Sequence, residues 1–482
     1  MGHPTVYPTG VTLYHPEKCW NGFTVFPCPN RGALLIDMNG NERHLWKDLQ
    51  GFPNKILPGG FVMGSRGVRN PRYGLQDQLD LVQVDFDGNI TWKFDHAEFI
   101  EDPGEVPQWM ARQHHDFQRE GNPVGYYAPG MLPGTDRGNT LILSHKDVHV
   151  PYISALPLVD DIIYEVDWEG NIVWEWLCSD HVEEMDFLEE ARNAMARDPN
   201  MRGGDTFDAA PEIGDWMHIN SMSVLGPNRW YDQGDERFHP DNIICDGRET
   251  NIIFIICKKT GKIVWQIGPN YYEKHLRHLG WIIGQHHAHM IPRNLPGEGN
   301  ILVFDNGGWG GYGAPNPASR TGHNHATRDW SRVLEINPQT LQIVWKYTPA
   351  EAGFAVPLDA YRFYSPFISS AQRLPNGNTL ITEGSDGRVF EVTPEHEIVW
   401  EYINPYWGTG ALALNMIYRA YRVPYEWVPQ LEKLPEVPIE KVDNAHFRMP
   451  GAGDSAHLTE VSVDGTQTDA PQGGHCVALI GD

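Results

Sequence analysis

Apolar and polar positions follow one short pattern that recurs six times along the chain. Each copy is an apolar strand, a polar turn containing Gly or Asn in most copies, and a second strand that ends in tryptophan. The copies begin at residues 34, 81, 163, 253, 333 and 389 and end at Trp46, Trp92, Trp174, Trp265, Trp345 and Trp400. One hairpin cannot bury its apolar face alone, whereas hairpins arranged radially can. The pattern therefore predicts an all-β fold, a six-bladed β-propeller with a central channel.

The spacing between the repeats is uneven and indicates insertions. A four-stranded blade needs roughly 40–50 residues, and several gaps are much longer. Residues 183–197 (EEMDFLEEARNAMAR) have apolar positions at helical spacing and predict a helical insertion, whereas 307–322 predict a long Gly- and Pro-rich loop. The pattern stops after Trp400, and 411–421 (ALALNMIYRAY) predict a helix. We therefore expect a propeller over 1–403, and a C-terminal helix and extended tail over 404–482.

Composition narrows the classes of partner. Asp and Glu number 63 against 37 Lys and Arg, for a net charge of −26, which argues against nucleic acid or an anionic membrane as a partner. No apolar run approaches the roughly 18 residues of a membrane span. The start MGHPT has neither a basic nor an apolar region, so we expect a cytoplasmic location. The six Cys are scattered without a CxxC and are expected to be free thiols. The C-terminal extension is the segment expected to contact a second subunit in a homo-oligomer.

A second repeat precedes several of the tryptophans. It consists of a polar residue, a strand and a turn with Gly-Asn, and its clearest copies start at His287 and Ser369, with looser copies at His115 and His218. The first strand of a propeller blade lines the channel. The alignment therefore places these four side chains around one axial space.

Histidine chemistry follows from this placement. Residues i and i+2 of a strand share a face, so His287 and His289 can both point into the channel. Neutral imidazoles bind transition metals, and the sequence predicts a Cu, Zn, Mn or Fe ion held by His115, His218, His287 and His289. The same side chains can instead act as general acid, general base or nucleophile. A weaker group, His145 and His149, is assigned no role.

Further polar and aromatic residues complete the predicted site. We expect His218, His287 and Arg388 to be catalytic, because a channel arginine would bind an anionic group. The expected substrate-binding residues lie after inner strands or in the long loops: Asn220, Asp305, Asn306, Tyr364 and Trp309. The aromatic residues in the long loops favour a small, aromatic or flat substrate.

Five segments carry a family resemblance: WMHINS at 216–221, QHHA at 285–288, FDNG at 304–307, FYSP at 363–366 and NMIYRA at 415–420. Together they resemble the arylsulfate sulfotransferase family of six-bladed propellers. The resemblance implies sulfuryl transfer between phenols through a histidine, no nucleotide cofactor, and sulfate binding by His218 and His287. The family's nucleophilic histidine follows a Gly-Ser on the last blade, but 384–388 read GSDGR in this chain; its arginine after the FDNG motif is replaced by GWGG at 308–311.

Three functional hypotheses follow. The first is an enzyme whose hydrolysis, lyase or oxidation chemistry is centred on the predicted metal. The second is a nucleotide-independent aryl sulfotransferase that uses a channel histidine. The third is a propeller that serves only as a binding platform, since a fold does not fix a function.

Overall fold

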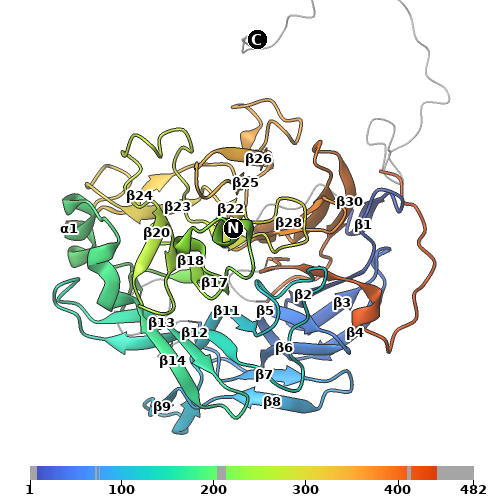
Figure 1. Ribbon diagram of the computed structural model, residues 1–482, viewed down its shortest axis with the longest axis horizontal. Helices are drawn as coiled ribbons and strands as arrows, with labels where there is room; N and C mark the ends of the chain where they lie inside the picture. Colours follow the sequence, from blue (N-terminus) through green and yellow to red (C-terminus); the bar gives the residue numbers. More distant parts are fainter. Residues whose placement is uncertain (1–7, 71–72, 75, 203–212, 410–413, 442–482) are drawn as a thin grey trace, which may run out of the picture. The chain divides into compact units, whose positions relative to one another are not determined.

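The computed structural model describes residues 8–70, 73–74, 76–202, 213–409 and 414–441. Within them, six sheets form the blades of a propeller, and the four main strands of each pair antiparallel, with one strand near the axis and one at the rim (Figure 1). Among the described residues, no helix is long and apolar enough to cross a membrane. The predicted six-bladed fold is confirmed.

Each blade is a sheet of at least four strands, which follow one another from the axis outward. Blade 1 contains β31 (Tyr421–Val423), β2 (Phe23–Cys28), β3 (Gly32–Ile36) and β4 (Glu42–Lys47). Blade 2 contains β5 (Gln50–Leu57), β6 (Phe61–Ser65), β7 (Leu81–Val84) and β8 (Ile90–Phe94). Blade 3 contains β11 (Gln113–Arg119), β12 (Thr140–Val148), β13 (Leu158–Val166) and β14 (Ile172–Leu177).

The other three blades follow the same order. Blade 4 contains β17 (Ile219–Val224), β18 (Ile243–Gly247), β19 (Ile252–Ile256) and β20 (Ile263–Ile267). Blade 5 contains β21 (His286–Met290), β22 (Ile301–Asp305), β25 (Arg332–Ile336) and β26 (Ile343–Tyr347). Blade 6 contains β27 (Ser370–Arg373), β28 (Thr379–Glu383), β29 (Arg388–Val392), β30 (Ile398–Ile403) and, at the rim, β1 (Gly10–Tyr14).

The smaller elements lie in the insertions. Two hairpins, β9 (Glu98–Ile100) with β10 (Gln108–Met110) and β23 (Trp309–Tyr312) with β24 (His323–Thr327), stand apart from the blades. Two short strands, β15 (Met201–Arg202) and β16 (Ile213–Asp215), extend blade 3. The helices are α1 (Glu189–Arg197), α2 (Arg229–Asp232) and the 3-10 turns η1 (Cys178–Glu184), η2 (Glu236–Phe238), η3 (Ala360–Arg362), η4 (Gly384–Asp386) and η5 (Tyr425–Trp427).

The repeated tryptophans link each blade to the next. In every blade the indole N–H of a tryptophan on the last strand of the outer hairpin donates to a backbone carbonyl of the following blade, at 2.8–3.0 Å. The six bonds run from Trp46 to Asp85, Trp92 to Trp168, Trp176 to Gly261, Trp265 to Pro338, Trp345 to Pro394 and Trp400 to Met38. Five of these are predicted repeat residues. In blade 3 the predicted residue is wrong by two positions along the same face of the strand, because the half-buried Trp174 makes no such bond and the buried Trp176 does.

The outer hairpins turn where the sequence places Asp, Gly and Asn. At 85–89, Gly88 takes a positive φ of 91°, which glycine adopts without strain, and Asp85 Oδ1 accepts from the backbone N–H of Asn89 at 2.8 Å. Apolar side chains of the middle strands then pack between blades, with Ile253, Ile255, Val303 and Leu334 fully buried in one such cluster.

Three boundaries differ from the sequence prediction. The helix predicted over 183–197 begins only at Glu189, after η1. The helix predicted over 411–421 is wrong in its described part, since 414–420 are not helical and β31 follows. Because β31 pairs with β2, the chain returns to blade 1 after residue 403. The tail expected to reach a second subunit, 442–482, lies outside the described residues.

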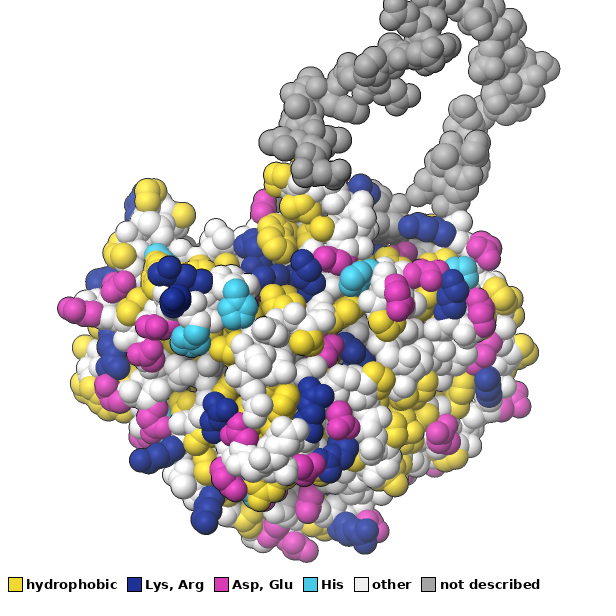
Figure 2. All heavy atoms as spheres, turned by 45° about the horizontal axis from the view of Figure 1, so that its top comes forward, with side chains coloured by type: hydrophobic (Ala, Val, Ile, Leu, Met, Phe, Trp, Pro, Cys, Tyr) yellow, Lys and Arg dark blue, Asp and Glu magenta, His cyan; other side chains and the backbone are white. Residues whose placement is uncertain are grey.

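The surface carries charges of both signs. Figure 2 shows acidic and basic side chains interspersed over the face in view, with no large patch of one sign.

Candidate functional site

The inner strands carry histidines in an uncommon backbone conformation. His115, His218, His287 and Ser369, which the repeat alignment places at matching positions, have φ values of 52°, 53°, 58° and 92°. The pairing of the inner strand shifts register at or beside the histidine in blades 3, 4 and 5. A left-handed conformation costs a non-glycine residue of order 1–3 kcal/mol and concentrates at functional sites. The shared left-handed conformation therefore indicates a functional role for these four equivalent positions of the inner strands.

His115 and His218 lie together near the axis. Their rings meet edge to face with centroids 4.6 Å apart. His218 Nδ1 forms a hydrogen bond with the buried carboxylate of Asp215, at the end of β16. Because the two ring nitrogens point in different directions, this bond leaves His218 Nε2 directed away from Asp215. Burial, together with nearby histidines, lowers the pKa of His115 well below its ordinary value.

Two of the three histidines of β21, His286 and His289, have both ring nitrogens engaged by protein partners. His286 Nδ1 donates to Asn306 Oδ1 at 2.8 Å, and its Nε2 accepts from the backbone N–H of Ile368 at 3.1 Å. His289 Nδ1 donates to the carbonyl of His287 at 2.9 Å, and its Nε2 lies 3.0 Å from the Tyr126 hydroxyl. Both nitrogens of His286 and of His289 are thus occupied, as in structural histidines.

The four predicted metal ligands do not form one group. His115 pairs with His218, and His287 pairs with His289, with ring centroids 4.3 Å apart. His289 has no nitrogen left for a metal.

Among the described residues, the set of three or more metal-ligating side chains whose donor atoms lie within 4.8 Å of one another is His114, His145 and Asp161.

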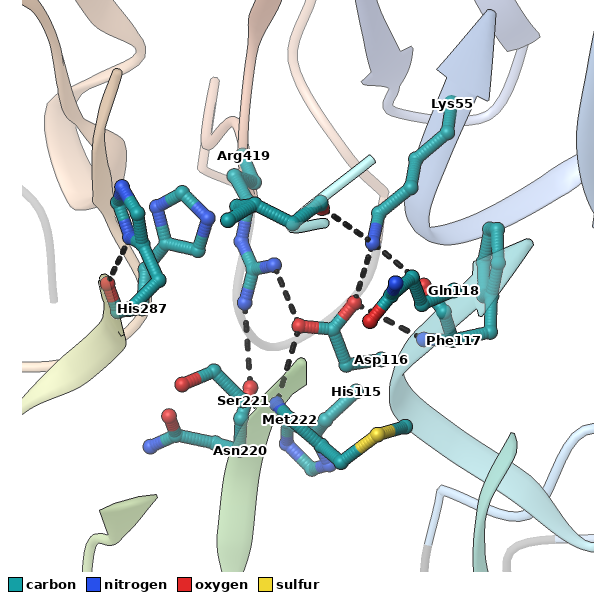
Figure 3. Close-up of polar contacts among 12 residues, drawn as sticks. Lys55, His115, Asp116, Phe117, Gln118, Asn220, Ser221, Met222, His287 and Arg419 are labelled. Atoms are coloured by element: carbon teal, nitrogen blue, oxygen red, sulfur yellow. Dashed lines mark hydrogen bonds and ion pairs between the residues drawn. The ribbon is translucent and has the colours of Figure 1, made fainter. Parts of the chain in front are cut away.

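An ion cluster on the axis was not predicted. Asp116 lies between Lys55 Nζ at 2.6 Å and Arg419 Nη1 at 2.9 Å, and all three side chains are buried (Figure 3). Arg419 Nη2 also donates to the carbonyl of Asn220 at 3.1 Å. Burial alone would raise the pKa of Asp116, but the two cations outweigh it and hold that pKa below its ordinary value. Arg419 belongs to the NMIYRA segment, which is visible in the sequence but carries no predicted site residue.

A second arginine lies beside His218. The backbone N–H of Arg248 donates to the carbonyl of His218 at 3.0 Å, and its guanidinium lies 5.3 Å from the ring centroid of Trp309. Burial lowers the pKa of His286 well below its ordinary value, and the charge of Arg248 is the second largest cause of this shift. The Arg248 guanidinium is also paired with the buried carboxylate of Glu249, and Trp309 is 39% exposed.

Two of the predicted polar residues are held in buried ion pairs. Arg388 binds Glu383 at 2.9 Å and Glu401 at 2.7 Å within blade 6. Asp305 lies between the guanidinium groups of Arg328, at 2.7 Å, and Arg332, at 2.6 Å. Their charges are already neutralised by protein partners, as in structural pairs.

The other predicted residues support the histidines or lie at the surface. Asn306 fixes His286 and donates to the carbonyls of Ser365 and Ile368. Asn220 donates to the carbonyl of Gln285 at 2.8 Å. Tyr364 is half-buried, and its backbone N–H donates to Glu383.

Comparison with solved structures returns propellers and proteins of unknown function. A protein of unknown function from Bacteroides caccae is 11% identical, covers 84% of this chain and 99% of its own, and has a TM-score of 0.41. A streptogramin B lyase is 11% identical, with coverage of 86% and 93% and a TM-score of 0.33. AztD from Citrobacter koseri is 10% identical, with coverage of 84% and 98% and a TM-score of 0.34. With TM-scores below 0.5, these structures are too dissimilar to indicate a function for the chain. No curated protein matches the chain.

A family model does match. The model of the arylsulfotransferase (ASST) family covers residues 133–416, more than half of the 482-residue chain. The matched region includes His218, the β21 histidines, blades 4 and 5, and strands β27 to β30 of blade 6. Together with the six-bladed fold, this match shows that the chain belongs to the arylsulfotransferase (ASST) family.

Proposed function

We propose that the protein transfers a sulfuryl group from an aryl sulfate to a phenol, with His218 as the nucleophile. The observation that carries the proposal is the buried hydrogen bond between His218 Nδ1 and Asp215. A carboxylate on Nδ1 keeps the proton there and leaves a lone pair on Nε2, which is the form of imidazole that attacks an electrophile. The left-handed backbone of His218 is a second sign that the position is functional.

The surroundings suit an anionic aromatic donor. Arg248, whose backbone N–H binds the His218 carbonyl and whose Nη1 is paired with Glu249, would bind sulfate oxygens through its other guanidinium N–H groups. Trp309 offers a solvent-facing ring on which an aryl group can stack. His115, whose ring touches His218, would donate a hydrogen bond to the transferred group. In this proposal, His218 takes the role of the family's last-blade histidine and Arg248 that of its arginine, both of which are missing from this chain.

The reaction is a double displacement. His218 Nε2 attacks sulfur, the sulfur–oxygen bond to the aryl group breaks, and the phenolate leaves and takes a proton from water. The oxygen of an acceptor phenol then attacks the sulfur, the sulfur–nitrogen bond breaks, and the phenolic proton passes to solvent. The histidine returns to its starting state, and no nucleotide is needed.

The test uses 4-nitrophenyl sulfate as donor and phenol as acceptor. We expect 4-nitrophenolate release that depends on phenol, its loss in His218→Asn, and its retention in His275→Asn, a change at an exposed histidine. Incubation with donor alone should add the mass of one SO₃ group to the peptide that contains His218. Full turnover by His218→Asn would overturn the assignment of the nucleophile, and no turnover with any of several aryl sulfates would overturn sulfuryl transfer.

A further inference from the structure

Three adjacent strands of blade 3 bring His114, His145 and Asp161 together. His145 on β12 and Asp161 on β13 are directly opposite each other in the antiparallel ladder, and His114 lies on the neighbouring strand β11. The imidazole rings of His114 and His145 are stacked with centroids 3.6 Å apart and planes 15° apart. The donor atoms of all three side chains lie within 4.8 Å of one another, and none of the three is more than 2% exposed.

Each of the three side chains has one unsatisfied donor atom. Nε2 of His114, Nε2 of His145 and Oδ1 of Asp161 have no hydrogen-bond partner among the described residues. His114 Nε2 lies 3.2 Å from Asp161 Oδ1, but the two atoms are not aligned for a hydrogen bond. Buried polar atoms are nearly always paired, and each orphan calls for an explanation such as an ion. One cation held between the three side chains would satisfy all three orphaned electron-pair donors.

The remaining atoms of the three side chains are held by protein. His145 Nδ1 donates to Asp77 Oδ1 at 2.7 Å, and Asp77 is in turn held by Arg112 at 2.8 Å. Asp161 Oδ2 accepts from the backbone N–H of Ile219 at 3.0 Å. A carboxylate on the far nitrogen of a histidine is the usual support of a metal ligand, because it fixes the tautomer and directs the lone pair of the other nitrogen to the metal.

We propose that His114 Nε2, His145 Nε2 and Asp161 Oδ1 bind a divalent first-row transition metal ion. Two imidazoles and one carboxylate form a donor set that suits Zn²⁺, Fe²⁺ or Mn²⁺, and the lack of thiolate ligands argues against Cu⁺. This site is distinct from the four-histidine site expected from the sequence, with which it shares no ligand. The rings of His114 and His145 are stacked, so their in-plane lone pairs run nearly parallel, and binding of the ion requires one imidazole to turn out of the stack.

The metal site is connected to the channel histidines. His114 Nδ1 lies 2.8 Å from His115 Nδ1. A metal on His114 Nε2 requires the proton on Nδ1, which then donates to His115 Nδ1, so the His115 proton must sit on Nε2. The metal thereby fixes His115 as a hydrogen-bond donor through its other nitrogen. This last role rests on the proposed function, whereas metal binding does not.

The experiment measures metal content of the full chain, purified without chelator, by elemental mass spectrometry. We expect about one equivalent of a single transition metal per chain in the wild type and in the control His149→Gln, which alters an exposed histidine of the same region. Asp161→Asn, which keeps the shape of the side chain, and His145→Gln should each reduce the content at least tenfold. Protein stripped with chelator and titrated with Co²⁺ alone should develop visible absorption in wild type and control, but not in the two variants.

The outcomes separate the site from the proposed function. Folded wild-type protein that neither retains a metal nor binds Co²⁺ would overturn the site, as would equal content in wild type and Asp161→Asn. Circular dichroism identifies a variant that fails to fold, and the other variant then decides. Sulfuryl transfer is scored on the same samples, so a metal-loaded but inactive protein refutes only the function, and a metal-free but active protein refutes only the site.

Discussion

Arg419 provides a direct test of the axial ion cluster. The change Arg419→Met keeps an unbranched side chain of similar length but removes the charge. It removes the 2.9 Å ion pair with Asp116 and the hydrogen bonds to the Tyr421 hydroxyl at 3.0 Å and the Asn220 carbonyl at 3.1 Å. Removal of one partner from a buried ion pair costs about 3–5 kcal/mol. Since Lys55 still compensates Asp116, we expect the low end, about 3 kcal/mol, in the free energy of unfolding.

Urea denaturation followed by tryptophan fluorescence at pH 7 measures this change. The control is Arg31→Met, which removes a partly exposed pair with Glu42 and should cost less than about 1 kcal/mol. The double variant Lys55→Met/Arg419→Met leaves Asp116 buried without a cation, so its cost should exceed the sum of the two single costs. A loss for Arg419→Met no larger than that for the control would refute the cluster as described.

Three more outcomes are expected. Trp176→Phe removes an inter-blade hydrogen bond and should lower the free energy of unfolding by about 1–3 kcal/mol, whereas Trp174→Phe should change it by less; equal losses in urea denaturation would contradict the assigned repeat position. Asp215→Asn allows the wrong tautomer of His218 and should lower kcat with an aryl sulfate about 100- to 10,000-fold, and an unchanged kcat would exclude a role for the carboxylate. Burial raises the pKa of Asp246 to about 7, so the stability that its protonated carboxyl contributes is full below about pH 4 and is lost as the pH rises through 7. Asp246→Asn should flatten that part of the profile of unfolding free energy against pH, and an unchanged slope would refute the raised pKa.

Local pattern explains what could be predicted from the sequence. An outer hairpin is a contiguous segment whose strands, turn and tryptophan are all visible within about 15 residues, so all six hairpins can be found from the sequence. The alignment of His115, His218, His287 and Ser369 is also visible, because repeats place equivalent residues at equivalent positions. The structure adds that all four share a left-handed backbone.

Contacts between distant segments explain what the sequence does not reveal. His145 opposes Asp161 only once the register of β12 and β13 is known, and sequence spacing does not give that register. Strand β31 has three residues and pairs with β2, whose residues lie nearly a full chain length away, so no local period marks it. The ion pairs of Arg388 and Asp305 likewise depend on partners from neighbouring strands, which is why charged residues expected in the channel are structural.

The closure of the ring and the assembly of the site depend on the same segment. Residues 418–423 contribute Arg419 to the axial cluster and then form β31, the inner strand of blade 1. In the same segment, the Tyr418 hydroxyl donates to the carbonyl of Asn220 at 3.2 Å, and Asn220 is two residues from His218. The inner strand of blade 1 therefore comes from a segment near the C-terminal end of the described chain. The same segment neutralises Asp116 between the histidine-bearing strands. A propeller that opens at blade 1 would lose Arg419 from its axis, so the proposed chemistry and the integrity of the ring should fail together.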